Sequence, residues 1–139
     1  MAGLIDTNIL VLRRSIDPAE LPDLLAISTI TLAELSAGPH NTDDPIERAR
    51  RLQLVQQAEA TFDPLPFDVA AARIFGMANA HVLAAGRKPR RRIADLMIAS
   101  VAAANLLPLY TTNPADFVGL EDLVTVVPVS RPDRPVGGG

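Results

Sequence analysis

Short apolar runs that alternate with helix-like segments most constrain what this chain can fold into. The runs at 3–5 and 24–27 end in polar residues, and each is followed by a segment whose apolar residues have helical spacing. Further strands are predicted at 61–65, 109–111 and 124–129. Parallel strands need crossover connections, which are usually helices. The alternation therefore predicts an α/β fold with a central, mainly parallel sheet flanked by helices on both faces.

The predicted helices differ in how much of their surface is apolar. The segment 45–60 carries one apolar stripe among charged residues, as a surface helix does. The segment 68–85 begins with a capping residue, Asp68, and ends at Gly86. The segment 93–107 is apolar on nearly every side, so we expect it to be buried between other elements.

The chain of 139 residues suits one compact domain. We expect this domain to cover residues 1–130 and the Pro- and Gly-rich tail, residues 131–139, to be disordered. The lack of cysteine excludes thiolate metal sites and cysteine nucleophiles. No apolar run approaches the ~20 residues of a membrane span, and the N-terminus lacks the pattern of a signal peptide. We therefore expect a cytoplasmic protein that does not contact a membrane.

Four acidic residues lie just after predicted strands or in the first turns of predicted helices. They are Asp6, Glu34, Asp95 and Asp116. In open α/β sheets, ligands bind at the carboxyl ends of the strands, where all four would lie. Asp95 is the most informative, because it is the only charged residue in an otherwise apolar helix. A buried carboxylate needs a partner or a metal ion, so the four positions predict a functional site.

Each of these acids also has a purely structural explanation. Asp6 could cap the first helix. Thr31 and Glu34 have the spacing of a capping box. Asn113 and Asp116 would fit the first turn of another helix. Since helix starts favour these residue types, the residues alone leave the structural and the functional explanation open.

A divalent cation would explain why four carboxylates gather at one place. Converging carboxylates repel one another unless a cation lies among them. Mg²⁺ and Mn²⁺ prefer oxygen ligands and can activate water for attack on a phosphodiester. Small polar neighbours would position water or hold the carboxylates without adding charge. These supporting residues are Thr7, Asn8, Thr111 and Asn113.

Five basic residues within six positions run directly into the predicted helix of Asp95. They are Arg87, Lys88, Arg90, Arg91 and Arg92. Such a cluster would contact an RNA backbone, although a solvated loop has the same composition. The formal net charge of −3 does not exclude RNA, because it becomes +1 once the four acids are set aside. We expect the non-specific affinity for RNA to be modest.

Four motifs in series carry a family resemblance. They read LIDTN, ISTITLAEL, RIADLMIAS and LYTTNPADF, and together they span roughly residues 4–129. In this order they resemble the PIN-domain ribonucleases, most closely the VapC-type toxins of type II toxin–antitoxin systems. The resemblance implies a PIN-like three-layer sandwich and an endoribonuclease that depends on Mg²⁺ or Mn²⁺. It also implies a homodimer and a small antitoxin protein whose C-terminal segment covers the acidic site.

The same resemblance assigns roles to the acids. Asp6 and Asp95 are the firmest matches and would bind the metal directly. Glu34 and Asp116 would complete the metal site, and Asn113 could take part of the role of Asp116. A metal-activated water would attack the phosphorus of an RNA phosphodiester and leave a 5′-phosphate and a 3′-hydroxyl.

Three other functions remain as alternatives to this interpretation. A catalytically silent module on the same fold would bind RNA or a protein. A haloacid-dehalogenase-like phosphatase normally has D-x-D after the first strand, whereas Thr7 and Asn8 follow Asp6 here. A metal-free ribonuclease would need both histidines, His40 and His81, at one site. P-loop, dinucleotide-binding and serine-hydrolase signatures are absent from the sequence.

Overall fold

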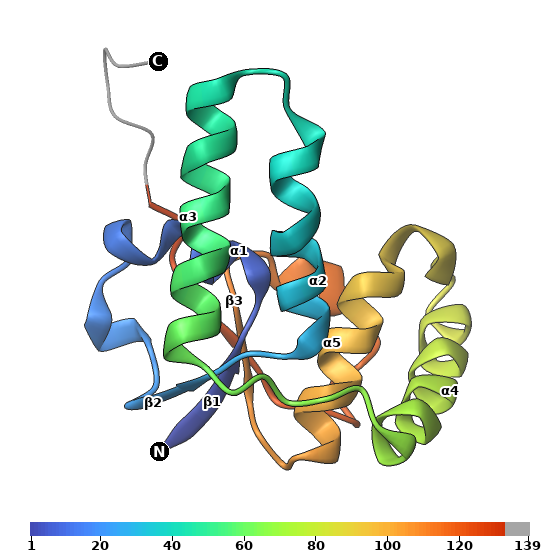
Figure 1. Cartoon of the computed structure of the whole chain (residues 1–139). Coiled ribbons are helices and arrows are strands. Elements are labelled where there is room, and N and C mark those ends of the chain that lie inside the picture. The colour runs from blue at the N-terminus through green and yellow to red at the C-terminus, as the bar shows by residue number, and fades with distance from the viewer. Residues whose placement is uncertain (133–139) are drawn as a thin grey trace.

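The structure, a computed structural model, describes residues 1–132. Within this range four strands form one parallel sheet in the order β2-β1-β3-β4 (Figure 1). The strands are β1 (Ala2–Ile5), β2 (Leu24–Ala26), β3 (Leu109–Thr111) and β4 (Val126–Pro128). The same residues form the α-helices α1 (Thr7–Leu12), α2 (Thr29–Ala37), α3 (Pro45–Thr61), α4 (Val69–Ala84) and α5 (Ile93–Ala104). The predicted α/β fold with a parallel sheet is confirmed.

Short 3₁₀ helices connect several of these elements. They are η1 (Arg13–Ser15), η2 (Pro18–Glu20), η3 (Gly38–Asn41), η4 (Pro89–Arg92) and η5 (Pro114–Phe117). The predicted basic loop thus contains η4, which leads directly into α5. The predicted tail falls largely outside the described residues, which end at 132.

The strand order places a topological switch point between β1 and β3. After β1 the chain moves to β2 on one side, and it later returns to β3 on the other side of β1. Leu4 is paired with Ala26 on β2 and with Leu109 on β3, so the strands end close together. Ligands bind in open α/β sheets at the carboxyl ends of the strands next to such a reversal. The topology therefore singles out the residues that follow Ile5 and Thr111.

Both faces of the sheet are covered, as the alternation of strands and helices predicts. Side chains of successive strand residues point to opposite faces. Leu4 packs into an apolar cluster with residues of α4 and α5, whereas Ile5 packs into a second cluster with residues of α1, α2 and α3. In Figure 1, α2 and α3 form a helical hairpin on one side, and α5 runs beside α4 on the other. The result is a three-layer arrangement with two cores.

One predicted strand is wrong. Residues 61–65 were expected to form a strand, but α3 continues to Thr61, and only Leu65 pairs with the sheet, through an isolated bridge to Ser28. The Leu65 amide donates to the carbonyl of Ile27, and its carbonyl accepts from the Thr29 amide, each at 2.9 Å. Pro64 and Pro66 flank this residue. The pairing does not extend beyond Leu65, because Thr29 begins α2 and the Phe67 amide donates to the Thr29 hydroxyl at 3.3 Å instead of to a strand carbonyl.

No helix in the described part of the chain is long and apolar enough to cross a membrane. The longest helix, α3, has 17 residues and carries charged residues along its length. Helix α5 is the most apolar, and six of its 12 residues are buried. Its burial matches the prediction that this helix lies between other elements.

The tight packing at Gly3 gives a test of the sheet. A Cβ atom on Gly3 would lie 2.5 Å from Cε1 of Tyr110 and 3.0 Å from Cγ of Pro22. We expect Gly3→Ala to lower the free energy of unfolding by about 1–3 kcal/mol, because the neighbours must shift to accept the methyl group.

Gly76→Ala is the matched control, since Gly76 lies inside α4 and a Cβ there would meet nothing within 4 Å. It should raise the free energy of unfolding by up to about 1 kcal/mol through its higher helix propensity. Urea denaturation measures the free energy of unfolding of the two variants. A Gly3→Ala protein as stable as the unsubstituted chain would contradict the packing described for β1.

Candidate active site

Asp6 lies at the switch point, directly between β1 and α1. Its backbone N–H donates to the carbonyl of Tyr110 at 2.9 Å, which continues the pairing of β1 with β3. Its side chain accepts from the Thr7 amide at 2.8 Å and from the Thr111 hydroxyl at 3.0 Å. Only 5% of the residue is exposed. Burial raises the pKa of this carboxyl, and the two hydrogen bonds oppose the shift.

Glu34 reaches the same place from α2 through a short chain of hydroxyl groups. The Thr7 hydroxyl donates to Oε1 of Glu34 at 2.7 Å and lies 2.9 Å from the Thr31 hydroxyl. Since Thr7 has a single hydroxyl proton, Thr31 must be the donor between the two threonines. Thr31 is fully buried and anchors this chain. The hydroxyls therefore fix the orientation of an otherwise exposed carboxylate.

The capping-box explanation for Glu34 is wrong. Thr31 lies inside α2, and Ser28 caps the helix by accepting from the Thr31 amide at 3.1 Å. Sequence analysis did not identify Thr31 as part of the site. The only available signal was a hydroxyl residue one helical turn before Glu34, on the same face of the helix.

Asp95 lies within electrostatic range of the other three predicted acids. It lies in the first turn of α5, and its pKa is raised from the ordinary value of 3.8 to about 7. Burial is the largest cause, and the negative charges of Asp6, Asp116 and Glu34 follow in that order. Electrostatic effects of this kind act at short range in a protein. The charges of the four acids predicted from the sequence are therefore coupled to one another at Asp95.

Asp116 is held by an arginine. It lies on η5, and its Oδ1 accepts from Nη1 of Arg92 at 2.5 Å. Asn113 precedes this short helix, but its side chain makes no capping hydrogen bond. Instead, its amide donates to the Thr111 hydroxyl at 3.0 Å. The helix start expected at this place is present as η5, with Asn113 at the N-cap position and Asp116 in the first turn, but without a capping bond from the Asn113 side chain.

The other predicted site residues are distributed around these acids. Thr7 and Thr111 contact carboxylates directly, whereas the Asn8 side chain is exposed and forms no hydrogen bond with any residue the structure describes. Arg87 donates to the carbonyl of Ala115 at 2.6 Å. Among the remaining basic residues, Lys88 and Arg90 are exposed; the side chain of Arg91 lies outside what the structure describes.

The acids provide only oxygen donors, as Mg²⁺ and Mn²⁺ prefer. Within residues 1–132, however, no three acidic or histidine side chains converge closely enough to form a complete metal site. Two of the four carboxylates are engaged by the protein itself: Glu34 accepts from the Thr7 hydroxyl, and Asp116 accepts from Arg92. The donor set fits a hard cation in its chemistry. Burial raises the pKa of Asp6 and Asp95 most, and the negative charges of the other acids add a smaller repulsion that such a cation would relieve.

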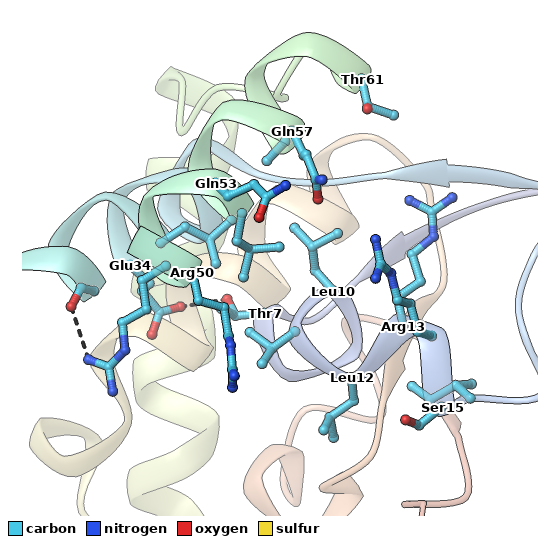
Figure 2. A pocket seen from close by; sticks show the side chains of 18 of the residues that line it. Thr7, Leu10, Leu12, Arg13, Ser15, Glu34, Arg50, Gln53, Gln57 and Thr61 are labelled. Atoms are coloured by element: carbon cyan, nitrogen blue, oxygen red, sulfur yellow. Dashed lines mark hydrogen bonds between the residues drawn. The ribbon is translucent and has the colours of Figure 1, made fainter. Parts of the chain in front are cut away.

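A groove of about 1120 Å³ begins at the acidic site and was not predicted from the sequence. It runs between α1 with η1 and the exposed side of α3, and Thr7 and Glu34 are the two site residues that line it. In Figure 2, Glu34 and Arg50 lie on one side of the groove and Arg13 and Ser15 on the other. The elements that form it are far apart in sequence, so no local pattern marks it.

Comparison with known proteins identifies the family. The PIN domain family matches residues 3–121. The chain belongs to the PIN-domain family. It is 37% identical over 128 residues to ribonuclease VapC5 of Mycobacterium tuberculosis, and the alignment covers 90% of this chain and 92% of that relative. The resemblance to VapC-type PIN domains is thereby confirmed.

Solved structures share the fold of this PIN domain. One is the crystal structure of VapBC-5 from Mycobacterium tuberculosis, a member of the VapBC family of toxin–antitoxin systems. It matches with a TM-score of 0.80 and 35% identity and covers 94% of this chain and 98% of that chain. VapBC2 from Rickettsia felis, bound to a DNA fragment from its promoter, matches with a TM-score of 0.69, 21% identity and coverage of 94% and 100%. The PIN-like three-layer sandwich is therefore confirmed.

The raised pKa of Asp95 predicts how this PIN domain responds to pH. The unfolded carboxyl loses its proton near pH 4, whereas the folded one keeps it until about pH 7. The folded state then binds more protons than the unfolded state, so stability is lost as pH rises through this range. We expect Asp95→Asn to raise the metal-free melting temperature at pH 8 and to have a smaller effect at pH 5.

Thermal melts in chelator at the two pH values test this. Asp63→Asn is the matched control, because Asp63 is an exposed acid outside the site, and it should have equal effects at both pH values. If Asp95→Asn also has the same effect at both, the coupling of the four acids is contradicted.

Proposed function

We propose that this PIN domain is a metal-dependent endoribonuclease that acts as the toxin of a toxin–antitoxin pair. The main support is the position of Asp95, where the charges of Asp6, Glu34 and Asp116 act together at the switch point of the sheet. The relative that is 37% identical is a ribonuclease, and solved relatives are toxin–antitoxin complexes. Both observations favour this activity over a haloacid-dehalogenase-like phosphatase.

In this proposal Asp6 and Asp95 hold the divalent cation, and Glu34 and Asp116 complete its site. When bound, Mg²⁺ or Mn²⁺ would activate water and stabilise the leaving oxygen of a phosphodiester. The chain itself fixes the carboxylates, since the Thr7 amide and the Thr111 hydroxyl bind both oxygens of Asp6. Asn113 supports this arrangement, because its amide donates to that same Thr111 hydroxyl.

The basic segment would guide RNA to this site. Lys88 and Arg90 are exposed beside the start of α5, and Arg87, Arg91 and Arg92 belong to the same segment. The partial positive charge at the N-terminus of α5 adds to their attraction for phosphate. With a net charge of −3 for the whole chain, RNA affinity should be modest and should fall with salt. RNA lies in the cytoplasm of a bacterial cell, where we propose that the protein acts.

We further propose a homodimer that is inhibited by a small antitoxin protein. The groove starts at Thr7 and Glu34, so a partner segment that filled it would also cover the acidic site. Val11 lines this groove with 54% of its surface exposed, and the floor includes the buried Leu10 and Leu35. Apolar contacts with an antitoxin segment and coverage of Glu34 would together prevent access of RNA.

Cleavage of RNA tests the proposed activity. The protein should cleave RNA in Mg²⁺ or Mn²⁺ and lose activity in excess chelator, and the products should carry a 5′-phosphate and a 3′-hydroxyl because water attacks. Asp95→Asn should lower the rate by roughly a hundredfold or more, whereas the exposed Asp63→Asn should cleave normally. End-labelled products on sequencing gels report both the rate and the termini.

Activity that survives chelation, or a cyclic phosphate product, would refute the metal-dependent mechanism. Binding of RNA without cleavage under any divalent cation would favour the silent binding module instead.

Inhibition by the antitoxin tests the role of the groove. The product of a small reading frame next to this gene should inhibit cleavage, and Val11→Glu should weaken inhibition at least tenfold by placing a charge in an apolar contact. Val118→Glu is the control, since Val118 is 44% exposed but lies outside the groove. Inhibition constants that are equal for the two variants would exclude the groove as the antitoxin site.

A further inference from the structure

The basic segment at 87–92 is attached at both ends to the short helix that carries Asp116. Arg87 donates to the carbonyl of Ala115 at 2.6 Å, and Arg92 donates to the Asp116 carboxylate. Both acceptors belong to η5. Two of the five basic residues are therefore bound within the protein, which differs from the solvated or RNA-contacting loop that the sequence suggested.

Arg92 occupies a special position among these residues. It is the last residue of η4 and immediately precedes α5, three positions before Asp95. Its side chain is 28% exposed and that of Asp116 is 37% exposed, so the pair is only partly screened by water. The positive charge of Arg92 also lowers the pKa of Asp95, against the effect of the three other acids.

Among the side chains that the structure describes in residues 1–132, which do not include that of Arg91, no second lysine, arginine or histidine forms an ion pair with any of the four acids. The guanidinium of Arg92 therefore offsets part of the repulsion among the four carboxylates. It also engages Oδ1 of Asp116, one of the two oxygens through which this carboxylate would bind a divalent cation. A divalent cation bound among these carboxylates and the guanidinium of Arg92 would repel each other, because both carry positive charge.

We propose that Arg92 is a positioning residue that serves as the resident counter-cation of the acidic site: it holds Asp116 in the metal-free protein and gives way when a divalent cation binds. This inference rests on the proposed metal-dependent function. It assigns Arg92 a role different from that of Lys88 and Arg90, which remain available to RNA. Exchange of one cation for another keeps the charge of the site partly balanced in both states.

Removal of the guanidinium should have two opposite effects. The metal-free protein should become less stable at pH 7.5, because Asp116 loses the ion pair with Arg92. Binding of Mn²⁺ should become tighter, on the order of tenfold, because a competing positive charge has been removed. A residue with a purely structural role would lower stability without strengthening metal binding.

Isothermal titration of the RNA-free protein with Mn²⁺, together with thermal melts in chelator, tests this inference. Arg92→Gln should show tighter Mn²⁺ binding, a lower metal-free melting temperature and a larger rise on addition of Mn²⁺. Arg90→Gln is the matched control: it makes the same charge change two residues away, at an exposed side chain without a hydrogen bond or ion pair to the described residues. It should alter Mn²⁺ affinity by less than about twofold.

If Arg92→Gln does not fold without metal, Arg92→Lys replaces it in the titration. Lysine keeps the charge, so this variant should bind Mn²⁺ within about twofold of the unsubstituted protein. A change beyond that range would overturn the inference. Unchanged or weaker Mn²⁺ binding in a folded Arg92→Gln variant would also overturn it, while leaving the proposed function intact. If the unsubstituted protein binds no Mn²⁺, both proposals fail together.

Discussion

The contact between the ends of β1 and β3 organises the rest of this PIN domain. The Asp6 amide bonds to the Tyr110 carbonyl, and the Thr111 hydroxyl bonds to the Asp6 carboxylate, across 105 residues of sequence. These bonds join the two strands at the point where the strand order reverses, and they orient an acid that is 5% exposed. Helix α5 brings Asp95 to the same point, so the site depends on correct pairing of the central strands.

An acid in this molecule can cap a helix and also lie in the candidate active site. Asp6 caps α1 through the Thr7 amide and at the same time belongs to the acidic site. Glu34 has no capping role, and its carboxylate is oriented by the hydroxyls of Thr7 and Thr31. Burial and the negative charges of the other acids raise the pKa of Asp95, and keeping this group ionised in the folded protein costs stability, as is common at the functional sites of proteins.

The basic segment likewise combines two roles. Arg87 and Arg92 pack against η5, while Lys88 and Arg90 extend into solvent. A run of like charges at one place in the sequence is thus divided by the tertiary structure. Part of the run stabilises the position of an acidic residue, and part is free to contact a polyanion such as RNA. Net charge alone cannot reveal such a division.

The sequence by itself determined the α/β class, four of the five predicted strands, the position of α4 between its Asp68 cap and Gly86, and the candidate acids. These features follow from local periodicity, turn residues and the residues that end strands. The tertiary structure decided which oxygen meets which donor: Thr31 bonds to Thr7 at the site, and Asp116 pairs with Arg92. Residues 61–65 do not form the predicted strand, because α3 continues to Thr61 and α2 begins at Thr29 beside the single bridge of Leu65. It also created the groove, which lies between α1 and α3. The physical reason is separation along the sequence, because these contacts join elements that are far apart in the chain. Their geometry depends on strand order and helix packing, which no local pattern specifies.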